Sequence, residues 1–176
     1  PRHVDTLGHH AGRDEPAVIL LHQVVERTAD LAAAYMASGF VHGVLNTDNM
    51  VVTGESFDYG PWRFLPYSDP SFTAAYFDEQ GLYAFGRQPS AALWNLSQLA
   101  SCLTLVADVS ALEPELQRFE GLYRAAFRKR MLAVLAFAVI VWMTETLDYA
   151  VSAVVIAALM AFLLGLQLME PSRAWV

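Results

Sequence analysis

Cysteine is almost absent from this chain of 176 residues, in which Cys102 is the only one. A lone cysteine excludes a disulfide within the chain and a zinc site built from several cysteines. It also fits a reducing compartment, so we expect a cytoplasmic protein. Because a free cysteine behaves as a small apolar residue, we expect Cys102 to be buried in a helix.

Basic residues are scarce as well. Lysine and arginine together number 11 against 18 aspartates and glutamates, and the formal net charge is -7. A broad nucleic-acid surface needs clustered positive charge, so we expect no nucleic-acid partner. Binding of a single nucleotide is compatible with this composition.

A secretory signal is also missing from the start of the sequence. Pro1 is not a translated start, and the residues that follow lack the basic and apolar segments of a signal peptide. We therefore interpret the chain as an internal fragment of a longer protein. Residues 1–15 are polar and show no apolar period, which predicts a loop or a frayed end.

Helical periodicity dominates the sequence that follows. Apolar residues recur at steps of three and four between Pro16 and Ser38, and Gly39 stands just past the end, which predicts a helix over 16–38. Pro89 and Pro114 open two further predicted helices.

The connection between the first two helices is expected to contain little regular structure. We expect a fold that is mainly α with a small β-hairpin. The predicted pieces are a β-hairpin at 50–57, a long proline-rich loop at 61–70, and two short extended pieces at 72–85 around a turn at 78–81.

The composition changes at Met131, and residues 131–176 predict an apolar helical tail. Uncharged runs cover 131–143 and 149–168, and the second is long enough to span a bilayer. Arg128, Lys129 and Arg130 would hold the near side cytoplasmic. Three alternatives stay open: a membrane-inserted tail, a pair of buried core helices, or an aberrant segment produced by a shifted reading frame or a gene rearrangement.

Three oxygen donors stand close together in a region with little other polar chemistry. They are Asp48, Asn49 and, nine residues later, Asp58. The predicted hairpin between them brings its two ends together. Magnesium prefers carboxylate, amide and phosphate oxygens and takes only one or two protein carboxylates. This pattern predicts a metal and nucleotide site, and the alternative is a simple Asx turn before a hairpin.

The spacing of these residues is that of a kinase catalytic loop. Such a loop reads H-R-D-x-x-x-x-N, and a D-F-G motif follows it. His42 and Asn49 have the same separation of seven residues, and Asp58-Tyr59-Gly60 takes the place of D-F-G. Val44 occupies the position of the kinase base and cannot accept a proton, whereas Asp48 can supply a carboxylate from another direction.

Longer motifs around this loop carry a specific resemblance. They are His42–Met50, Phe57–Leu65, Asp69–Pro70, Gly81–Phe85, Gln88–Pro89 and Leu93–Leu96. In these stretches the chain closely resembles the selenoprotein O family (SelO, formerly YdiU), whose members are kinase-fold pseudokinases that act as protein adenylyltransferases. The likeness runs from about Val24 to Arg130.

The resemblance implies a fold, an activity and roles for particular residues. Residues 16–130 would form the C-terminal lobe of a protein-kinase-like fold, with the catalytic loop at 42–60 and the N-terminal lobe absent. The implied activity is transfer of AMP from ATP to Ser, Thr or Tyr hydroxyls of proteins, with Mg²⁺ as cofactor. Asp48 matches the family's proton acceptor. Asn49 and Asp58 match its magnesium ligands, and Asp58 also touches the nucleotide.

Two departures from the family pattern leave a second interpretation open. The chain has no glycine-rich loop, and its only lysine, Lys129, lies downstream of the metal site. The family's closing segment is expected to be charged and amphipathic, whereas residues from Met131 on are apolar. The alternative is a catalytically inactive, truncated lobe that associates with a membrane or binds a partner. By itself the 176-residue chain is expected to transfer no AMP.

Overall fold

The computed structural model describes residues 16–145, 151 and 154. The chain divides into two compact units, Pro1–Arg130 and Met131–Val176. The predicted loop at 1–15 lies outside the described residues. The predicted apolar run at 149–168 does too, except for Val151 and Val154.

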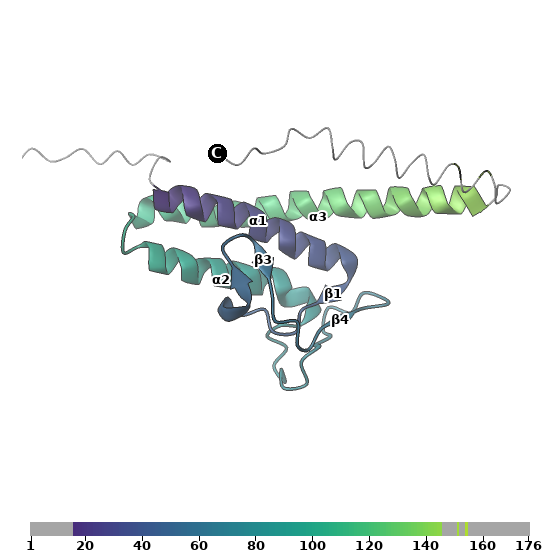
Figure 1. Cartoon of the computed structure of the whole chain (residues 1–176), viewed down its shortest axis with the longest axis horizontal. Coiled ribbons are helices and arrows are strands. Elements are labelled where there is room, and N and C mark those ends of the chain that lie inside the picture. The colour runs from purple at the N-terminus through teal and green to yellow at the C-terminus, as the bar shows by residue number, and fades with distance from the viewer. Residues whose placement is uncertain (1–15, 146–150, 152–153, 155–176) are drawn as a thin grey trace, which may run out of the picture. The chain divides into compact units, whose positions relative to one another are not determined.

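The described residues are mainly helical and contain two small antiparallel sheets, as the sequence predicts for the secondary structure (Figure 1). The first helix has the predicted bounds. The elements are α1 (Pro16–Ser38), β1 (Phe40–Val41), η1 (Thr47–Asn49), β2 (Met50–Val51), β3 (Glu55–Ser56), β4 (Arg63–Phe64), η2 (Phe85–Arg87), α2 (Gln88–Leu103) and α3 (Val109–Glu145).

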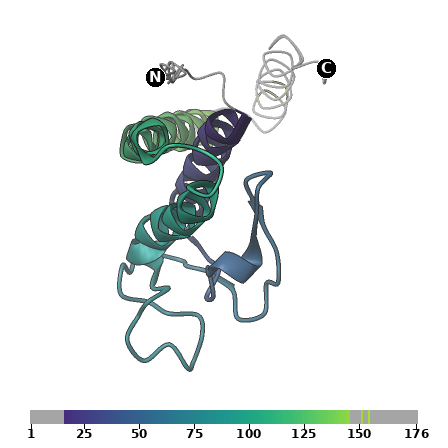
Figure 2. The ribbon, with the colours of Figure 1, turned by 90° about the vertical axis from the view of Figure 1, so that its left-hand side faces the viewer.

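The core of the first unit lies between α1, α2 and the beginning of α3. Val25 and Leu21 of α1, Leu96 of α2, and Leu112 and Phe119 of α3 are buried in one hydrophobic cluster. Burial of one such side chain contributes roughly 1.5–3 kcal/mol to the free energy of unfolding. The strands and loops between α1 and α2 lie together on one side of these two helices (Figures 1 and 2).

A charged cluster joins α1 to α3 beside this core. The carboxylate of Glu115 accepts hydrogen bonds from Arg118 Nη1 at 2.7 Å and from His22 Nδ1 at 2.8 Å. Arg118 Nη2 also donates to Glu26 Oε1 at 3.1 Å. Burial opposes ionisation of Glu115, but the hydrogen bonds from Arg118 and His22 outweigh it and lower the pKa of this carboxyl. The cluster therefore fixes α1 against α3 with paired charges.

Two short pairings fold the chain back after α1. In the predicted hairpin, Met50 of β2 pairs with Ser56 of β3 and Val51 pairs with Glu55. Gly54 forms its turn at a φ of +79°, where an added Cβ would lie 2.2 Å from the Cβ of Arg27. The second sheet was not predicted: β1 pairs antiparallel with β4, and β4 lies in the segment at 61–70 that was expected to be a loop.

The prediction of extended pieces at 72–85 is wrong, although the turn at 78–81 is present. The carboxylate of Asp78 accepts hydrogen bonds from the backbone N–H groups of Leu82 and Tyr83, at 2.7 and 2.8 Å. Gly81 closes the turn with a φ of +64°. Because Asp78 takes these N–H groups, they are not free to pair with a neighbouring strand.

The third helix begins earlier than predicted, at Val109 instead of Pro114. Asp108 caps its first turn, because its carbonyl accepts hydrogen bonds from the N–H groups of Ala111 and Leu112. The buried side chain of Leu112 gives this extra turn a place in the core. Pro114 lies near the beginning of the helix, where it removes only one backbone hydrogen bond.

Two further outcomes concern α2 and the end of α3. Cys102 lies in a helix as expected, but its side chain is exposed, so the prediction of burial is wrong. The first apolar run, residues 131–143, lies in the last part of α3, and side chains such as Leu132 and Phe137 are exposed there. Within the residues that the structure describes, no helix is long and apolar enough to cross a membrane.

Candidate active site

Two buried side-chain amides of α2 form hydrogen bonds with the loop at residues 42–49 and with the strand before it. Gln88 accepts a hydrogen bond from the N–H of His42 at 2.9 Å and donates to the carbonyl of Phe40 at 2.8 Å. Asn95 donates to the carbonyl of Leu45 at 3.0 Å. The helix therefore fixes the loop at both its beginning and its middle.

Asn49 ends this loop in the η1 turn and is almost fully buried. Its Nδ2 donates to the carbonyl of Val44 at 2.8 Å, and its backbone N–H donates to the carbonyl of Asn46 at 3.2 Å. Because the amide nitrogen faces Val44, the side-chain oxygen faces away from it as an acceptor. Asp48 precedes Asn49 in the same turn and is exposed.

The hairpin places Asp58 beside Asn49, as the sequence predicts. The N–H of Phe57, the residue before Asp58, donates to the carbonyl of Asn49 at 3.1 Å. The N–H of Gly60 donates to the carbonyl of Asp58 at 2.8 Å, which closes a tight turn. Asp58 has a φ of 55°, a left-handed conformation that is uncommon outside glycine and is tolerated best by Asn and Asp.

Gly43 allows the chain after Asp58 to approach the loop. It has a φ of +86°, and an added Cβ would lie 1.9 Å from the carbonyl oxygen of Pro61. Only glycine fits this position without moving the backbone. The two segments that carry Asp48, Asn49 and Asp58 are thus packed directly against each other.

His42 links the two segments as a neutral side chain. Its Nε2 lies 2.9 Å from the carbonyl of Phe57, so this nitrogen carries the proton and donates it, while Nδ1 accepts from the N–H of Val44 at 3.4 Å. Burial lowers the pKa of His42, and it outweighs the hydrogen bond to Phe57 and the charge of Asp58, which act in the opposite direction.

This burial predicts a pH dependence of stability. The pKa of His42 is lower in the folded chain than the value of about 6.5 in the unfolded chain, so below that pH the unfolded state binds more protons. As the pH decreases below about 6.5, we therefore expect the free energy of unfolding to decrease. The slope of this decrease should be steeper in the unaltered chain than in His42→Gln, by up to about 1.4 kcal/mol per pH unit. Denaturant titrations from pH 7.5 downward measure both slopes, and equal slopes would contradict a buried neutral histidine.

Asp48 presents its carboxylate to solvent near Tyr83. Burial is the main cause that raises the pKa of Tyr83, and the charges of Asp78 and Asp48 add to it. Among the described residues, Asp48 and Asp58 form no ion pair. Both carboxylates are therefore free to act on a ligand instead of on a neighbouring cation.

The donor set of Asn49 and Asp58 is small and suits magnesium. In the described part of the chain, no group of three or more His, Cys, Asp and Glu side chains could hold a metal alone. One amide oxygen and one or two carboxylates are nevertheless the ligands expected when magnesium keeps water and phosphate oxygens as its other ligands. The side-chain oxygen of Asn49, turned away from Val44, provides one such ligand.

The sequence did not reveal the residues that position this site. The spacing between His42 and Asn49 was the only signal at His42. Gln88 and Asn95 each lie in a motif that resembles the family, but the sequence indicated no role for either amide. Buried polar residues in an otherwise apolar helix face are the one signal that points to such positions, because a buried amide needs partners.

Comparison with known proteins identifies the class of protein to which this site belongs. The chain is 47% identical over 129 residues to the protein nucleotidyltransferase YdiU of Gloeobacter violaceus, covering 73% of this chain and 27% of that protein. It is 48% identical over 115 residues to YdiU of Trichodesmium erythraeum, covering 65% and 24%. For YdiU of Vibrio atlanticus the identity is 44% over 118 residues, covering 67% and 24%. These relatives are nucleotidyltransferases by name.

The family is shown by a match over most of the chain. The model of the family described as "Protein adenylyltransferase SelO" matches residues 6–169. The chain belongs to the SelO family. The match continues past Arg130, so the likeness extends further than the motifs in 24–130 indicate and includes most of the apolar tail. The chain spans about a quarter of the length of the curated relatives it matches.

Proposed function

We propose that this chain supplies the metal-binding and proton-accepting part of a protein adenylyltransferase, which transfers AMP from ATP to Ser, Thr or Tyr hydroxyls of proteins. One observation carries the proposal. The hydrogen bond from Phe57 N–H to the carbonyl of Asn49 brings Asp58 beside Asn49, with Asp48 exposed in the same turn. Membership in the SelO family supports the same reaction.

Each side chain has a distinct task in the proposed reaction. Asn49 and Asp58 would hold Mg²⁺, which when bound neutralises phosphate charge and orients the triphosphate. Asp58 also contacts the nucleotide. The oxygen of the substrate hydroxyl attacks the α-phosphate while Asp48 accepts the hydroxyl proton, and pyrophosphate leaves. His42 holds the carbonyl of Phe57 and thereby positions Asp58.

The fold and location of the whole protein belong to the same proposal. Helices α1 and α2, the β2–β3 hairpin and the loop at 42–49 would form part of the C-terminal lobe of a kinase-like fold. A cytoplasmic location is consistent with the single cysteine. Attachment of residues 149–168 to a membrane stays a second prediction.

A chimera tests the function directly. The stretch of Gloeobacter violaceus YdiU that matches this chain would be replaced by the corresponding 129 residues, so that the site is read in a full-length relative. We expect the chimera to transfer AMP to protein, a chelator to abolish the transfer, and added Mg²⁺ to restore it, because Asn49 and Asp58 act through the metal. The 176-residue chain alone, assayed beside it, is expected to be inactive.

The control for this experiment is the unaltered relative, prepared and assayed in parallel. A folded chimera without activity, beside an active parent, would show that residues of this chain do not support the transfer. Activity that persists in the chelator would contradict the metal-binding roles of Asn49 and Asp58.

A further inference from the structure

A chain of three hydroxyl groups connects α1 to the turn that carries Asp58. The hydroxyl of Tyr35 in α1 forms a hydrogen bond with Oγ of Ser56 in β3. Ser56 Oγ lies 3.4 Å from the hydroxyl oxygen of Tyr59, and that oxygen lies 2.7 Å from the carbonyl oxygen of Ser56. Asp58 stands between Ser56 and Tyr59 in the sequence, so this chain reaches both sides of a residue proposed to bind the metal.

The direction of donation along the chain follows from its last member. A carbonyl oxygen only accepts, so Tyr59 donates its single hydroxyl proton to the carbonyl of Ser56. The Tyr59 oxygen is then the acceptor for Ser56 Oγ, which uses its own proton in that contact. Ser56 Oγ therefore accepts from the hydroxyl of Tyr35. Burial raises the pKa of Tyr35, so this hydroxyl keeps the proton that it donates.

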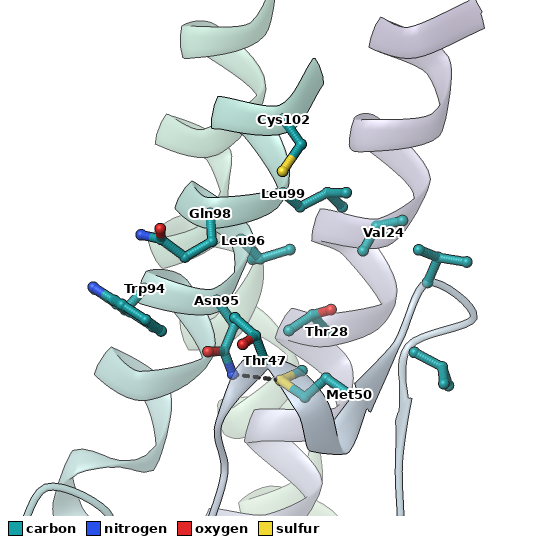
Figure 3. A pocket seen from close by; sticks show the side chains of 12 residues that line it. Val24, Thr28, Thr47, Met50, Trp94, Asn95, Leu96, Gln98, Leu99 and Cys102 are labelled. Carbon is teal, nitrogen blue, oxygen red and sulfur yellow. Dashed lines mark hydrogen bonds between the residues drawn. The ribbon is translucent and has the colours of Figure 1, made fainter. Parts of the chain in front are cut away.

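The base of the β2–β3 hairpin is held from two sides. Ser56 is 7% exposed and pairs with Met50 of β2. On the side of α2, Asn95 Nδ2 donates to the sulfur of Met50 at 2.9 Å, a contact drawn as a dashed line in Figure 3. On the side of α1, the hydroxyl of Tyr35 donates to Ser56. The two helices thus fix the strand pair from which the chain continues to Asp58.

Asp58 has a backbone conformation that needs support from its surroundings. Its φ of 55° lies in the left-handed region, which is unfavourable for residues other than glycine. Residues persist in such conformations where the structure around them holds them. The hydrogen bond from the Tyr59 hydroxyl to the carbonyl of Ser56 spans Asp58 and closes the chain around it. The two tyrosine hydroxyls therefore contribute to fixing Asp58 relative to Asn49.

We propose that Tyr35 and Tyr59 are positioning residues that act through Ser56 and hold the carboxylate of Asp58 where it can bind Mg²⁺ together with Asn49. This inference rests on the proposed function, because it takes Asp58 as a metal ligand. A ligand that is already held in place loses less conformational freedom when the metal binds, so binding is tighter. The two hydroxyls thus affect metal affinity and not proton acceptance.

Tyr35→Phe and Tyr59→Phe in the YdiU chimera test this role, because each change removes one hydroxyl and keeps the aromatic ring. We expect either change to raise the Mg²⁺ concentration for half-maximal AMP transfer about five- to tenfold, as for the loss of one hydrogen bond. Saturating Mg²⁺ should restore the rate of the unaltered chimera. In the double variant the increase should be smaller than the product of the two single increases, because both changes interrupt one chain.

The matched control is Tyr67→Phe, which removes a hydroxyl from a side chain that is 79% exposed. It should leave the Mg²⁺ requirement unchanged. The free energy of unfolding would be measured for all variants. If Tyr35→Phe and Tyr59→Phe lower it but leave the Mg²⁺ requirement of an active chimera unchanged, the proposal is overturned and the hydroxyls serve only the stability of the fold.

A second measurement distinguishes failure of this inference from failure of the proposed function. ¹H–¹⁵N NMR spectra of the ¹⁵N-labelled 176-residue chain require no transfer activity. Tyr35→Phe is expected to shift the backbone amide signals of Asp58 and Gly60, whereas Tyr67→Phe is expected to leave them in place. Unshifted signals in a folded Tyr35→Phe chain would overturn the inference. Shifted signals beside an inactive unaltered chimera would support the positioning of Asp58 and contradict only the transfer of AMP.

Discussion

Replacing Asp48 by asparagine in the YdiU chimera is expected to lower the rate of AMP transfer by about 10²–10⁴-fold, the contribution typical of a general base. Asparagine keeps the size of the side chain but cannot accept the proton of an attacking hydroxyl. Since Asp48 is exposed and forms no ion pair among the described residues, its loss should not disturb the fold. The measurements are the rate of AMP incorporation and the affinity for ATP.

The matched control for this change is Glu55→Gln, which removes the same charge from an exposed position in the hairpin that follows the η1 turn. It should leave the transfer rate unchanged. ATP affinity should be nearly the same in both variants and in the unaltered chimera, because proton acceptance does not contribute to binding. A transfer rate that survives in Asp48→Asn would remove Asp48 from the role of proton acceptor.

The second large effect is expected at Asp58. Asp58→Asn should lower AMP transfer by at least about 10²-fold and raise the Mg²⁺ concentration needed for half-maximal activity, because a neutral amide is a weaker ligand for a hard cation. Asparagine tolerates the left-handed conformation of this position nearly as well as aspartate does. The change is therefore one of charge with little change of backbone strain. A titration of activity with Mg²⁺ measures both effects.

The free energy of unfolding distinguishes a metal-binding role of Asp58 from a purely structural role. The free energy of unfolding of Asp58→Asn should stay within about 0.5 kcal/mol of the unaltered chimera, as for a surface substitution. An Asp58→Asn variant that is folded, transfers AMP normally and shows an unchanged Mg²⁺ requirement would mean that Asp58 serves only the turn to Gly60.

Local signals allowed part of this fold to be predicted. The bounds of α1 follow from Pro16 at its first turn and Gly39 after its last, and these two residues act through their own backbone conformations. The β2–β3 hairpin follows from a turn that Gly54 forms between two short extended pieces. Each of these predictions depends on residues that are close together in the sequence.

The elements that the sequence did not predict correctly depend on contacts between residues that are distant in the sequence. The pairing of β1 with β4 joins Phe40 to Phe64, and strands of two residues leave no periodicity to read. The early start of α3 depends on the burial of Leu112 against other helices. A proline pattern alone therefore placed the beginning of this helix one turn too late.

The candidate site also combines features that local sequence predicts with features that depend on contacts between distant residues. The oxygen donors Asp48, Asn49 and Asp58 could be proposed from spacing and from the family resemblance. The residues that hold them in place could not be predicted, because Gln88, which accepts from His42 N–H, and Asn95, which donates to the carbonyl of Leu45, lie more than 40 positions away from their partners. Gln88 and Asn95 of α2 come within hydrogen-bond distance of the loop only when the chain folds.

The identity of the transferred group tests the central claim most directly. The YdiU chimera would be incubated with a protein substrate and ATP that carries radioactive phosphorus in either its α- or its γ-phosphate. If Asp48, Asn49 and Asp58 serve AMP transfer, the protein retains label from the α-position and none from the γ-position, because pyrophosphate is the leaving group. Label retained from the γ-position would instead show phosphoryl transfer and would contradict this account.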